Sequence, residues 1–158
     1  MNKNLAVIFA IIAAATFGCG KSQTYESSDS KVTVREEGDT AKYEVKTEKG
    51  KATVAVSDSA VAIPSTFPKD VPILKGAVPK LAMTQGKTEL LHLQVSGGVG
   101  DVAKEYADKL KGEGWEIEST MNMGESSMVH AKKGNRKCVA VVLKDDTETL
   151  VQLTVAEE

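Results

Sequence analysis

Residues 88–110, TELLHLQVSGGVGDVAKEYADKL, change from a repeat of two residues to a repeat of three to four. In the first part, Leu91, Leu93 and Val95 alternate with other residues, which is typical of a strand with one buried face. After two glycines the apolar residues recur at helical spacing, at Val99, Val102, Ala103, Tyr106 and Leu110. The stretch therefore predicts a strand followed by an amphipathic helix that ends near Gly112 or Gly114.

Further strand patterns follow the helix. The first begins with Trp115, Ile117, Ser119 and Met121, which strict alternation would place on one face. The later patterns cover residues 128–133, 136–144 and 150–155, with short links that suit hairpins. We therefore expect residues 80–158 to form an α+β domain, in which one helix packs on a mostly antiparallel sheet.

Residues 31–57 alternate between apolar and polar side chains, with turn signals at Gly38 and Gly50. The pattern predicts a three-stranded β-meander with one apolar face. Because three short strands are barely stable alone, we expect that face to pack on the domain, on a second copy or on a partner. The alternative is a disordered stalk rich in Ser, Thr, Lys and Glu. The apolar positions are Val32, Val34, Ala41, Tyr43, Val45, Ala52, Val54 and Val56.

All four prolines fall between residues 64 and 79. This density of proline excludes a helix and favours an extended strap over residues 58–79, between the meander and the domain. Its side chains that are able to pack on a core are Phe67, Val71, Ile73 and Leu74.

The N-terminus has the features of an export signal. Lys3 precedes an apolar run from Leu5 to Phe17, which ends at Gly18 and Cys19. As a helix this run is about 20 Å long, shorter than the roughly 30 Å hydrocarbon core of a membrane. Residues 1–18 are therefore predicted to be a signal peptide rather than a membrane span.

Residues 16–19, Thr-Phe-Gly-Cys, resemble the lipobox of bacterial lipoprotein precursors. The resemblance implies cleavage before Cys19 and attachment of acyl chains such as palmitate to that residue. By the sorting rules of such lipoproteins, Gly20 in the second mature position implies the outer membrane. The alternative is an ordinary signal peptide cut after Ala13–Ala15, which would release a soluble protein in which Cys19 and Cys138 can pair. If Cys19 is lipidated, residues 19–30 are the lipidated cysteine and a flexible polar tether, with a reach of up to about 40 Å.

Residues 60–158 resemble a family of uncharacterised bacterial envelope lipoproteins. The resemblance lies in the segment Pro-x-x-Phe-Pro-x-Asp-Val-Pro, here Pro64 to Pro72, in Gly76, and in a helix that ends in Gly114-Trp115. It implies a small domain behind a lipid anchor. It carries no activity, substrate or catalytic residue to this chain.

The charge balance argues against nucleic acid as a partner. Loss of the leader removes Lys3, so 19 of the 20 Lys and Arg residues remain against 22 Asp and Glu, a net charge of −3. The two signs are interspersed, and no basic block is present that could neutralise several phosphates. The expected partners are the membrane, through the N-terminal lipid, and an envelope protein.

Sequence motifs for catalysis are absent, and we expect no enzyme activity and no cofactor. Cys138 lies in an apolar strand pattern, where a buried thiol is the usual outcome. One set of residues has the chemistry of a soft-metal site, because thioethers and imidazole suit Cu(I). The set consists of Met121, Met123, Met128 and His130.

The sequence thus predicts a lipid-anchored envelope protein with a binding or scaffolding role and no catalysis. The alternative is a periplasmic protein that binds a ligand or Cu(I) through the Met and His hairpin.

Overall fold

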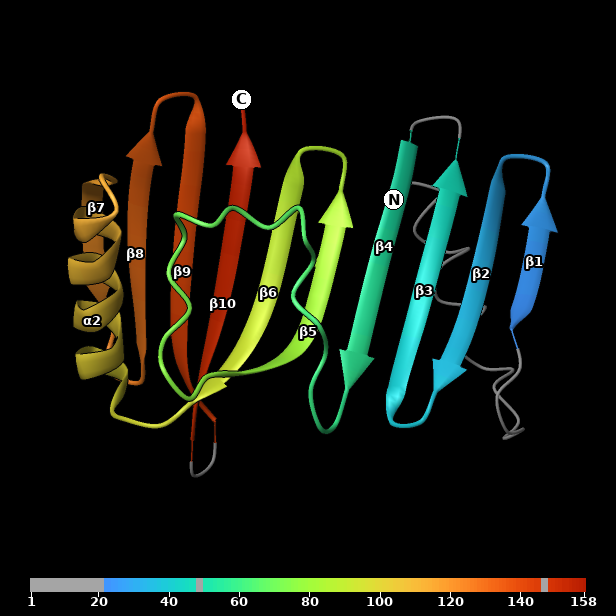
Figure 1. The fold of residues 1–158 in the computed structure, drawn as a ribbon. Helices are drawn as coiled ribbons and strands as arrows, with labels where there is room; N and C mark the ends of the chain where they lie inside the picture. Colours follow the sequence, from blue (N-terminus) through green and yellow to red (C-terminus); the bar gives the residue numbers. More distant parts are fainter. Residues whose placement is uncertain (1–21, 48–49, 146–147) are drawn as a thin grey trace.

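The computed structural model describes residues 22–47, 50–145 and 148–158. Within them, the chain forms ten strands and one helix (Figure 1). In chain order the elements are β1 (Gln23–Ser27), β2 (Ser30–Glu37), β3 (Thr40–Thr47), β4 (Gly50–Ser57), β5 (Val78–Gln85), β6 (Thr88–Val95), α2 (Val99–Gly112), β7 (Glu116–Asn122), β8 (Ser126–Lys133), β9 (Arg136–Asp145) and β10 (Glu148–Glu157).

All ten strands belong to one sheet, in the order β1-β2-β3-β4-β5-β6-β10-β9-β8-β7. Every neighbouring pair is antiparallel. The prediction of an α+β fold is therefore wrong, and the described part of the chain is mainly β. The error arises at β5, which the sequence analysis assigned partly to the strap.

β5 joins the meander to the rest of the sheet. It pairs with β4 on one side and with β6 on the other. The meander strands β2, β3 and β4 are present at the predicted positions, but they extend the sheet edge to edge and do not pack their apolar face on the domain. Proline at position 79 hid this strand, because proline is rare inside sheets, and the register shifts between Pro79 and Leu81 to accommodate it.

The segment predicted as a polar tether contains β1, which pairs with β2 through residues 23–27. Its five residues are all exposed, so no apolar periodicity marks the strand in the sequence. Pairing of a polar edge strand satisfies backbone groups without needing a buried side chain.

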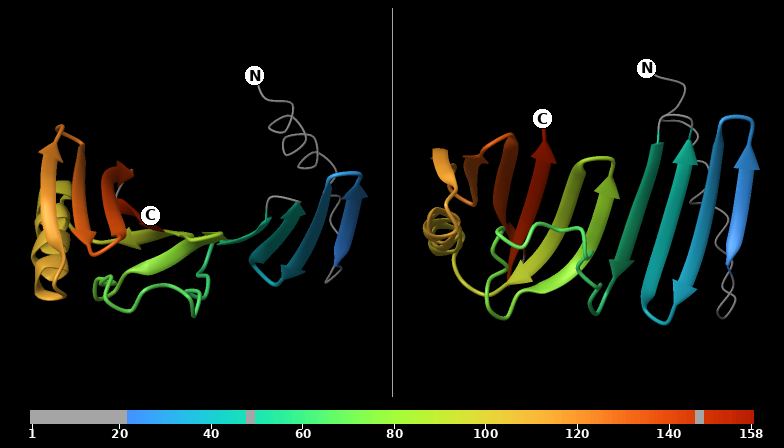
Figure 2. Two further views of the ribbon diagram at one scale, coloured as in Figure 1. Left: turned by 90° about the horizontal axis from the view of Figure 1, so that it is seen from above. Right: turned by 45° about the horizontal axis from the view of Figure 1, so that its top comes forward.

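The core lies between one face of β5 to β10 and a second layer made by α2 and the strap (Figure 2). On β6 and β10 alternate residues are fully buried, among them Leu91, Leu93, Val151 and Leu153. We call this covered side the inner face and the opposite side the outer face.

The strap crosses the inner face in front of β10, β6 and β5 (Figure 1). Phe67, Val71 and Leu74 are buried, and Ile73 packs against the same core, as predicted. The strap therefore fills the part of the inner face that α2 leaves open.

Helix α2 buries Val102, Ala103, Tyr106 and Leu110 against β7, β8 and β9. It ends in a Schellman motif, in which the Trp115 N–H donates to Leu110 O at 2.9 Å and the Gly114 N–H donates to Lys111 O at 3.0 Å. Gly114 has a φ of 83°, which a residue with a side chain adopts only at a cost. The motif turns the chain so that Trp115 is buried beside the helix end. Helix α2, the one helix of the described residues, is not long and apolar enough to span a membrane.

Candidate functional site: the outer face of the sheet

The outer face carries aligned apolar side chains on every strand. Residues directly opposite each other on antiparallel strands point to the same side. The register connects Val34, Tyr43, Val54, Met83 and Leu90 in one row from β2 to β6. Among the described residues, neither α2 nor the strap covers this side (Figure 2). The apolar residues of the outer face are Tyr25, Val32, Val34, Ala41, Tyr43, Val45, Ala52, Val54, Val56, Leu81, Met83, Leu90, Leu150, Val139, Val141, Leu143, Met128 and Met121.

In the meander, which we define as β1 to β4, most apolar side chains lie on the outer face and most charged side chains lie on the other side. Glu36 on the outer face and Ala55 on the inner face are exceptions. Tyr25, Tyr43 and Val56 on its outer face are 38%, 37% and 39% exposed, which is high for large apolar residues in a folded protein. An uncovered apolar face of this kind is a candidate binding surface.

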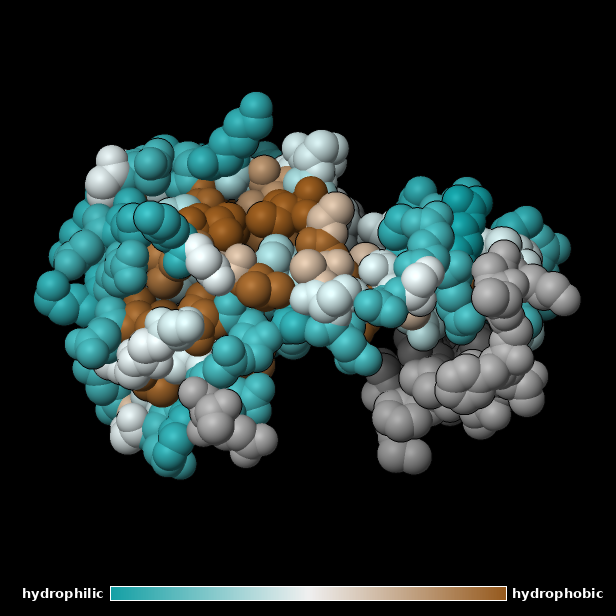
Figure 3. Space-filling view, turned by 60° about the horizontal axis from the view of Figure 1, so that its bottom comes forward, coloured by the Kyte–Doolittle hydropathy of each residue, from teal (hydrophilic) through white to brown (hydrophobic). Residues whose placement is uncertain are grey.

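The other side of the meander carries the charges. Lys31 pairs with Glu26 across the β1–β2 strands, and Lys42 lies 2.7 Å from Glu37. The Glu44 carboxylate forms ion pairs with Lys46 Nζ, at 3.1 Å, and with Lys51 Nζ, at 2.9 Å. In the view of Figure 3 the meander is hydrophilic, whereas hydrophobic residues gather over the half that contains the strap and the helix. Water solvates this charged side, so the apolar side is the one available for a partner.

Three of the four predicted soft ligands lie together at the other end of the sheet. Met121 of β7 is directly opposite Met128 of β8, and His130 follows two residues later on the same face. The Nε2 atom of His130 lies 2.8 Å from Sδ of Met128. Met123 follows the end of β7 and is 61% exposed.

Trp115 does not belong to this group, although strict alternation placed it on the face of Met121. The register of β7 shifts between Ile117 and Ser119, so Ile117 lies on the inner face, whereas Ser119 and Met121 lie on the outer face. Trp115 is 3% exposed, whereas Met121 is 45% exposed.

Trp115 instead takes part in an ionic cluster that fixes the strap. Its Nε1–H donates to the backbone oxygen of Asp70 at 2.7 Å, and the Arg136 guanidinium lies over its ring, 5.0 Å from the centroid. Both terminal guanidinium nitrogens of Arg136, Nη1 and Nη2, donate to the Asp70 carboxylate, at 2.9 and 2.6 Å, and Lys133 Nζ donates to it at 2.7 Å. The hydrogen bonds from Arg136, together with those from Lys133, outweigh desolvation and hold the pKa of Asp70 well below its usual range.

The sequence analysis missed this cluster because its members lie 63 and 66 residues apart from Asp70. The proline-rich segment was the available signal, since Asp70 is the one acidic residue between Pro64 and Pro79. The cluster holds the strap against β8 and β9. We call this set of four residues, Asp70, Trp115, Lys133 and Arg136, the clasp.

Cys138 is fully buried on the inner face of β9. Burial raises the pKa of its thiol to about 12, so the reactive thiolate is scarce near neutral pH. The predicted buried role of Cys138 is confirmed.

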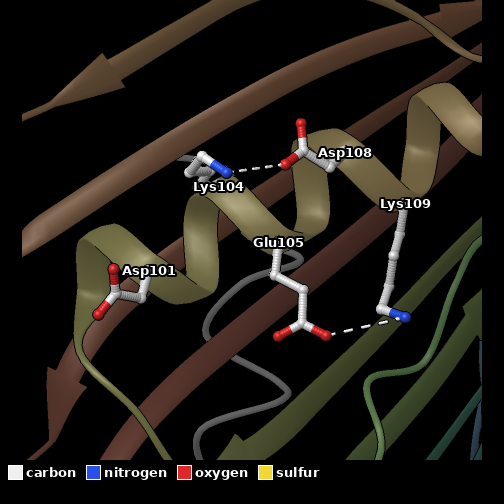
Figure 4. A pocket seen from close by; sticks show the side chains of 5 residues that line it. All are labelled: Asp101, Lys104, Glu105, Asp108 and Lys109. Atoms are coloured by element: carbon white, nitrogen blue, oxygen red, sulfur yellow. Dashed lines mark hydrogen bonds and ion pairs between the residues drawn. The ribbon is translucent and has the colours of Figure 1, made fainter.

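A shallow depression runs along the exposed face of α2 (Figure 4). Its charged side chains pair with one another, Lys104 with Asp108 at 3.1 Å and Lys109 with Glu105 at 3.7 Å. Such i, i+4 pairs are typical of a solvated helix face and do not form a ligand site.

Within residues 22–47, 50–145 and 148–158, no group of three or more His, Cys, Asp or Glu side chains is placed to hold a metal ion. Thioether sulfurs of methionine are outside that ligand class. The predicted signal peptide, residues 1–18, and the lipidation site Cys19 lie outside the described residues.

Comparison with known proteins gives one similarity. A family model described as START domain-like matches residues 83–149, from the end of β5 to the start of β10. No curated protein and no solved structure matches the chain. The similarity covers the part that contains α2, and it is compatible with a binding role.

Proposed function

We propose that the protein is a lipid-anchored, non-enzymatic binding protein of the bacterial outer membrane, which binds an envelope protein through the outer face of the meander. The observation that carries the proposal is the chemical separation of the two sides of β1 to β4. The START domain-like similarity of residues 83–149 supports a binding role for the adjoining domain.

The size of the surface suits a protein partner. β1 has five residues and β2 to β6 have eight each. With strands about 4.8 Å apart and about 3.4 Å per residue, the outer face of β1 to β6 is about 730 Å². A standard protein interface buries about 800 Å² on each partner. The interface therefore includes Leu81 and Met83 of β5, which continue the apolar rows of the meander.

The position of β1 supports a partner surface close to the membrane. If Cys19 carries the lipid, the chain from Cys19 to Gln23 spans at most about 14 Å. The expected reach of about 40 Å assumed a flexible segment up to Ser30, which β1 now shortens. The proposed partner is therefore a protein of the membrane surface or a membrane protein exposed on its periplasmic side.

Two neighbouring residues on opposite sides of β3 test the proposal. A photo-crosslinking amino acid at Tyr43 samples the outer face, and the same group at Lys42 samples the charged side. We expect the full chain, expressed in its own host, to crosslink one envelope protein from position 43 and not from position 42. Mass spectrometry of the adducts identifies the partner and reads the modification of Cys19.

Crosslinks from position 43 to a second copy of the chain or to lipid would refute the hetero-partner, and equal crosslinking from both positions would refute the surface. Cys19→Ser tests the anchor separately, because loss of the lipid should release the protein from the membrane fraction. A protein that stays membrane-bound after this substitution would contradict lipidation.

A further inference from the structure

Three soft side chains converge at the end of the sheet farthest from the meander. Met121 and Met128 are directly opposite each other on β7 and β8, and His130 is two positions along β8 from Met128. Met128 and His130 point to the outer face, since Val129 and Ala131, which alternate with them on β8, are buried on the inner face. Met121 points the same way because it is directly opposite Met128. The fold, rather than sequence proximity, brings Met121 to the other two.

The contact between Met128 and His130 is direct. His130 Nε2 and Met128 Sδ are 2.8 Å apart, and no carboxylate of the described chain hydrogen-bonds to this imidazole. His92, the other histidine of the outer face, instead has Gln152 Oε1 at 3.0 Å from its Nε2. The two histidines therefore differ in their surroundings, and only His130 faces a sulfur.

We propose that Met121, Met128 and His130 form a binding site for one soft monovalent cation, Cu(I). Two thioether sulfurs and one imidazole nitrogen are neutral ligands, so the ion keeps its single charge. Thioethers select Cu(I) over harder ions such as Mg²⁺ and Ca²⁺, which require oxygen ligands. Met128 has three rotatable bonds, and a small rotation admits the ion between its sulfur and the imidazole.

The surroundings of the site favour a weakly hydrated ion. Val139 is opposite His130 on β9, and Val141 is opposite Met128, so the neighbouring strand is apolar on this side. Met123, beyond the end of β7, is exposed and supplies a further thioether that can close the open side. Because the site lies on β7 and β8, it is independent of the proposed partner surface on β1 to β6.

Competition titration tests the site directly. The mature chain with Cys19→Ser is titrated with Cu(I) under anaerobic reducing conditions against bicinchoninate, a chelator with a coloured Cu(I) complex. We expect one Cu(I) per chain with a Kd well below micromolar. Met128→Leu and His130→Gln should each weaken binding at least tenfold, and X-ray absorption should show sulfur and nitrogen neighbours.

The chain offers matched controls on the same face. Met83→Leu and His92→Gln remove the same residue types from β5 and β6, and both should leave the affinity unchanged. Far-UV circular dichroism verifies that each variant is folded. A Cu(I) Kd of micromolar or weaker for the parent chain would overturn the proposal. So would Met128→Leu and His130→Gln variants that bind Cu(I) as tightly as the parent chain. Loss of binding in Cys138→Ala alone would also overturn it, since the buried thiol would then be the ligand.

Discussion

Neutralising Asp70 should release the strap from the sheet. The Asp70→Asn substitution keeps the shape of the side chain but removes the charge that accepts two hydrogen bonds from Arg136 and one from Lys133. The Trp115 hydrogen bond to the Asp70 backbone is retained in principle, so the variant isolates the ionic part of the clasp.

The exposure of the three charged side chains determines how much the Asp70→Asn substitution lowers the free energy of unfolding. The side chains of Asp70, Arg136 and Lys133 are 23%, 29% and 33% exposed. Removing one member of a buried pair costs about 3–5 kcal/mol, whereas exposed pairs contribute about 0–1 kcal/mol. We therefore expect Asp70→Asn to lower the free energy of unfolding by about 2 kcal/mol. For a domain of this size that corresponds to a decrease in Tm of about 6–8 °C.

The effect should depend on pH in a defined direction. The pKa of Asp70 is depressed in the folded state, first by Arg136, so its stabilising contribution is complete above the ordinary carboxyl pKa of about 3.9. It is lost as the pH falls towards the lower pKa of the folded state. The difference between the parent chain and Asp70→Asn should thus be constant from about pH 5 to pH 8 and should shrink below about pH 4.

Urea unfolding followed by fluorescence measures this effect, because the single tryptophan of the chain, Trp115, lies in the clasp. Release of the strap should also shift its emission to longer wavelength. Asp108→Asn is the matched control, since the Lys104–Asp108 pair is exposed and its loss should cost less than about 0.5 kcal/mol. Equal stability of Asp70→Asn and the parent chain at pH 7 would refute the clasp.

Other variants test the core and the turn before α2. Cys138 in the Cys19→Ser chain should react with a thiol reagent at pH 8 only as fast as the protein unfolds, and fast labelling under native conditions would contradict its burial. Gly97→Ala should cost about 1–3 kcal/mol, because φ is 121° and a Cβ would lie 3.3 Å from Val102 Cγ2. Gly100→Ala in the first turn of α2 should instead stabilise by up to about 1 kcal/mol, and the same chemical denaturation compares the two. Leu153→Ala should cost about 2–5 kcal/mol, measured as the urea midpoint, and a cost below about 1 kcal/mol would mean that β10 is not central to the core.

Local periodicity predicted most of the elements. The alternation around Leu93 and the helical spacing around Tyr106 correspond to β6 and α2, and the strap buries Phe67 as expected. These elements were predicted correctly because each packs one face against the core, so that its buried residues recur at the period of a strand or helix.

The fold class failed because of a strand without such a pattern. β5 begins with Val78 and Pro79, and of its residues only Ala82 is buried. Without β5, the meander and residues 80–158 look like separate units. The single helix is then a large part of the predicted domain, which favours the α+β class. The pairing of β5 with both neighbours is a long-range property, which no window of a few residues contains.

The candidate sites also differ in whether local periodicity predicts them. The apolar face of the meander and the group of Met121, Met128 and His130 follow from a repeat of two, which the register preserves across neighbouring strands. The shift in β7 that separates Trp115 from Met121 has no signal in the sequence. The Asp70 clasp joins the strap to residues that lie 45, 63 and 66 positions further along the chain.

The meander takes almost no part in the core. Ala55 is its one apolar residue that packs against the core cluster of the described residues, and β4 pairs with β5 only from Ala52 to Val56. We expect the meander to unfold as its own cooperative unit, whose amides exchange with solvent before those of β6, β10 and β9. The meander is in effect one layer of an unfinished β-sandwich. A partner that supplies the second layer would stabilise this unit by mass action, so partner binding and slowed amide exchange in β1 to β4 are two measures of the same free energy.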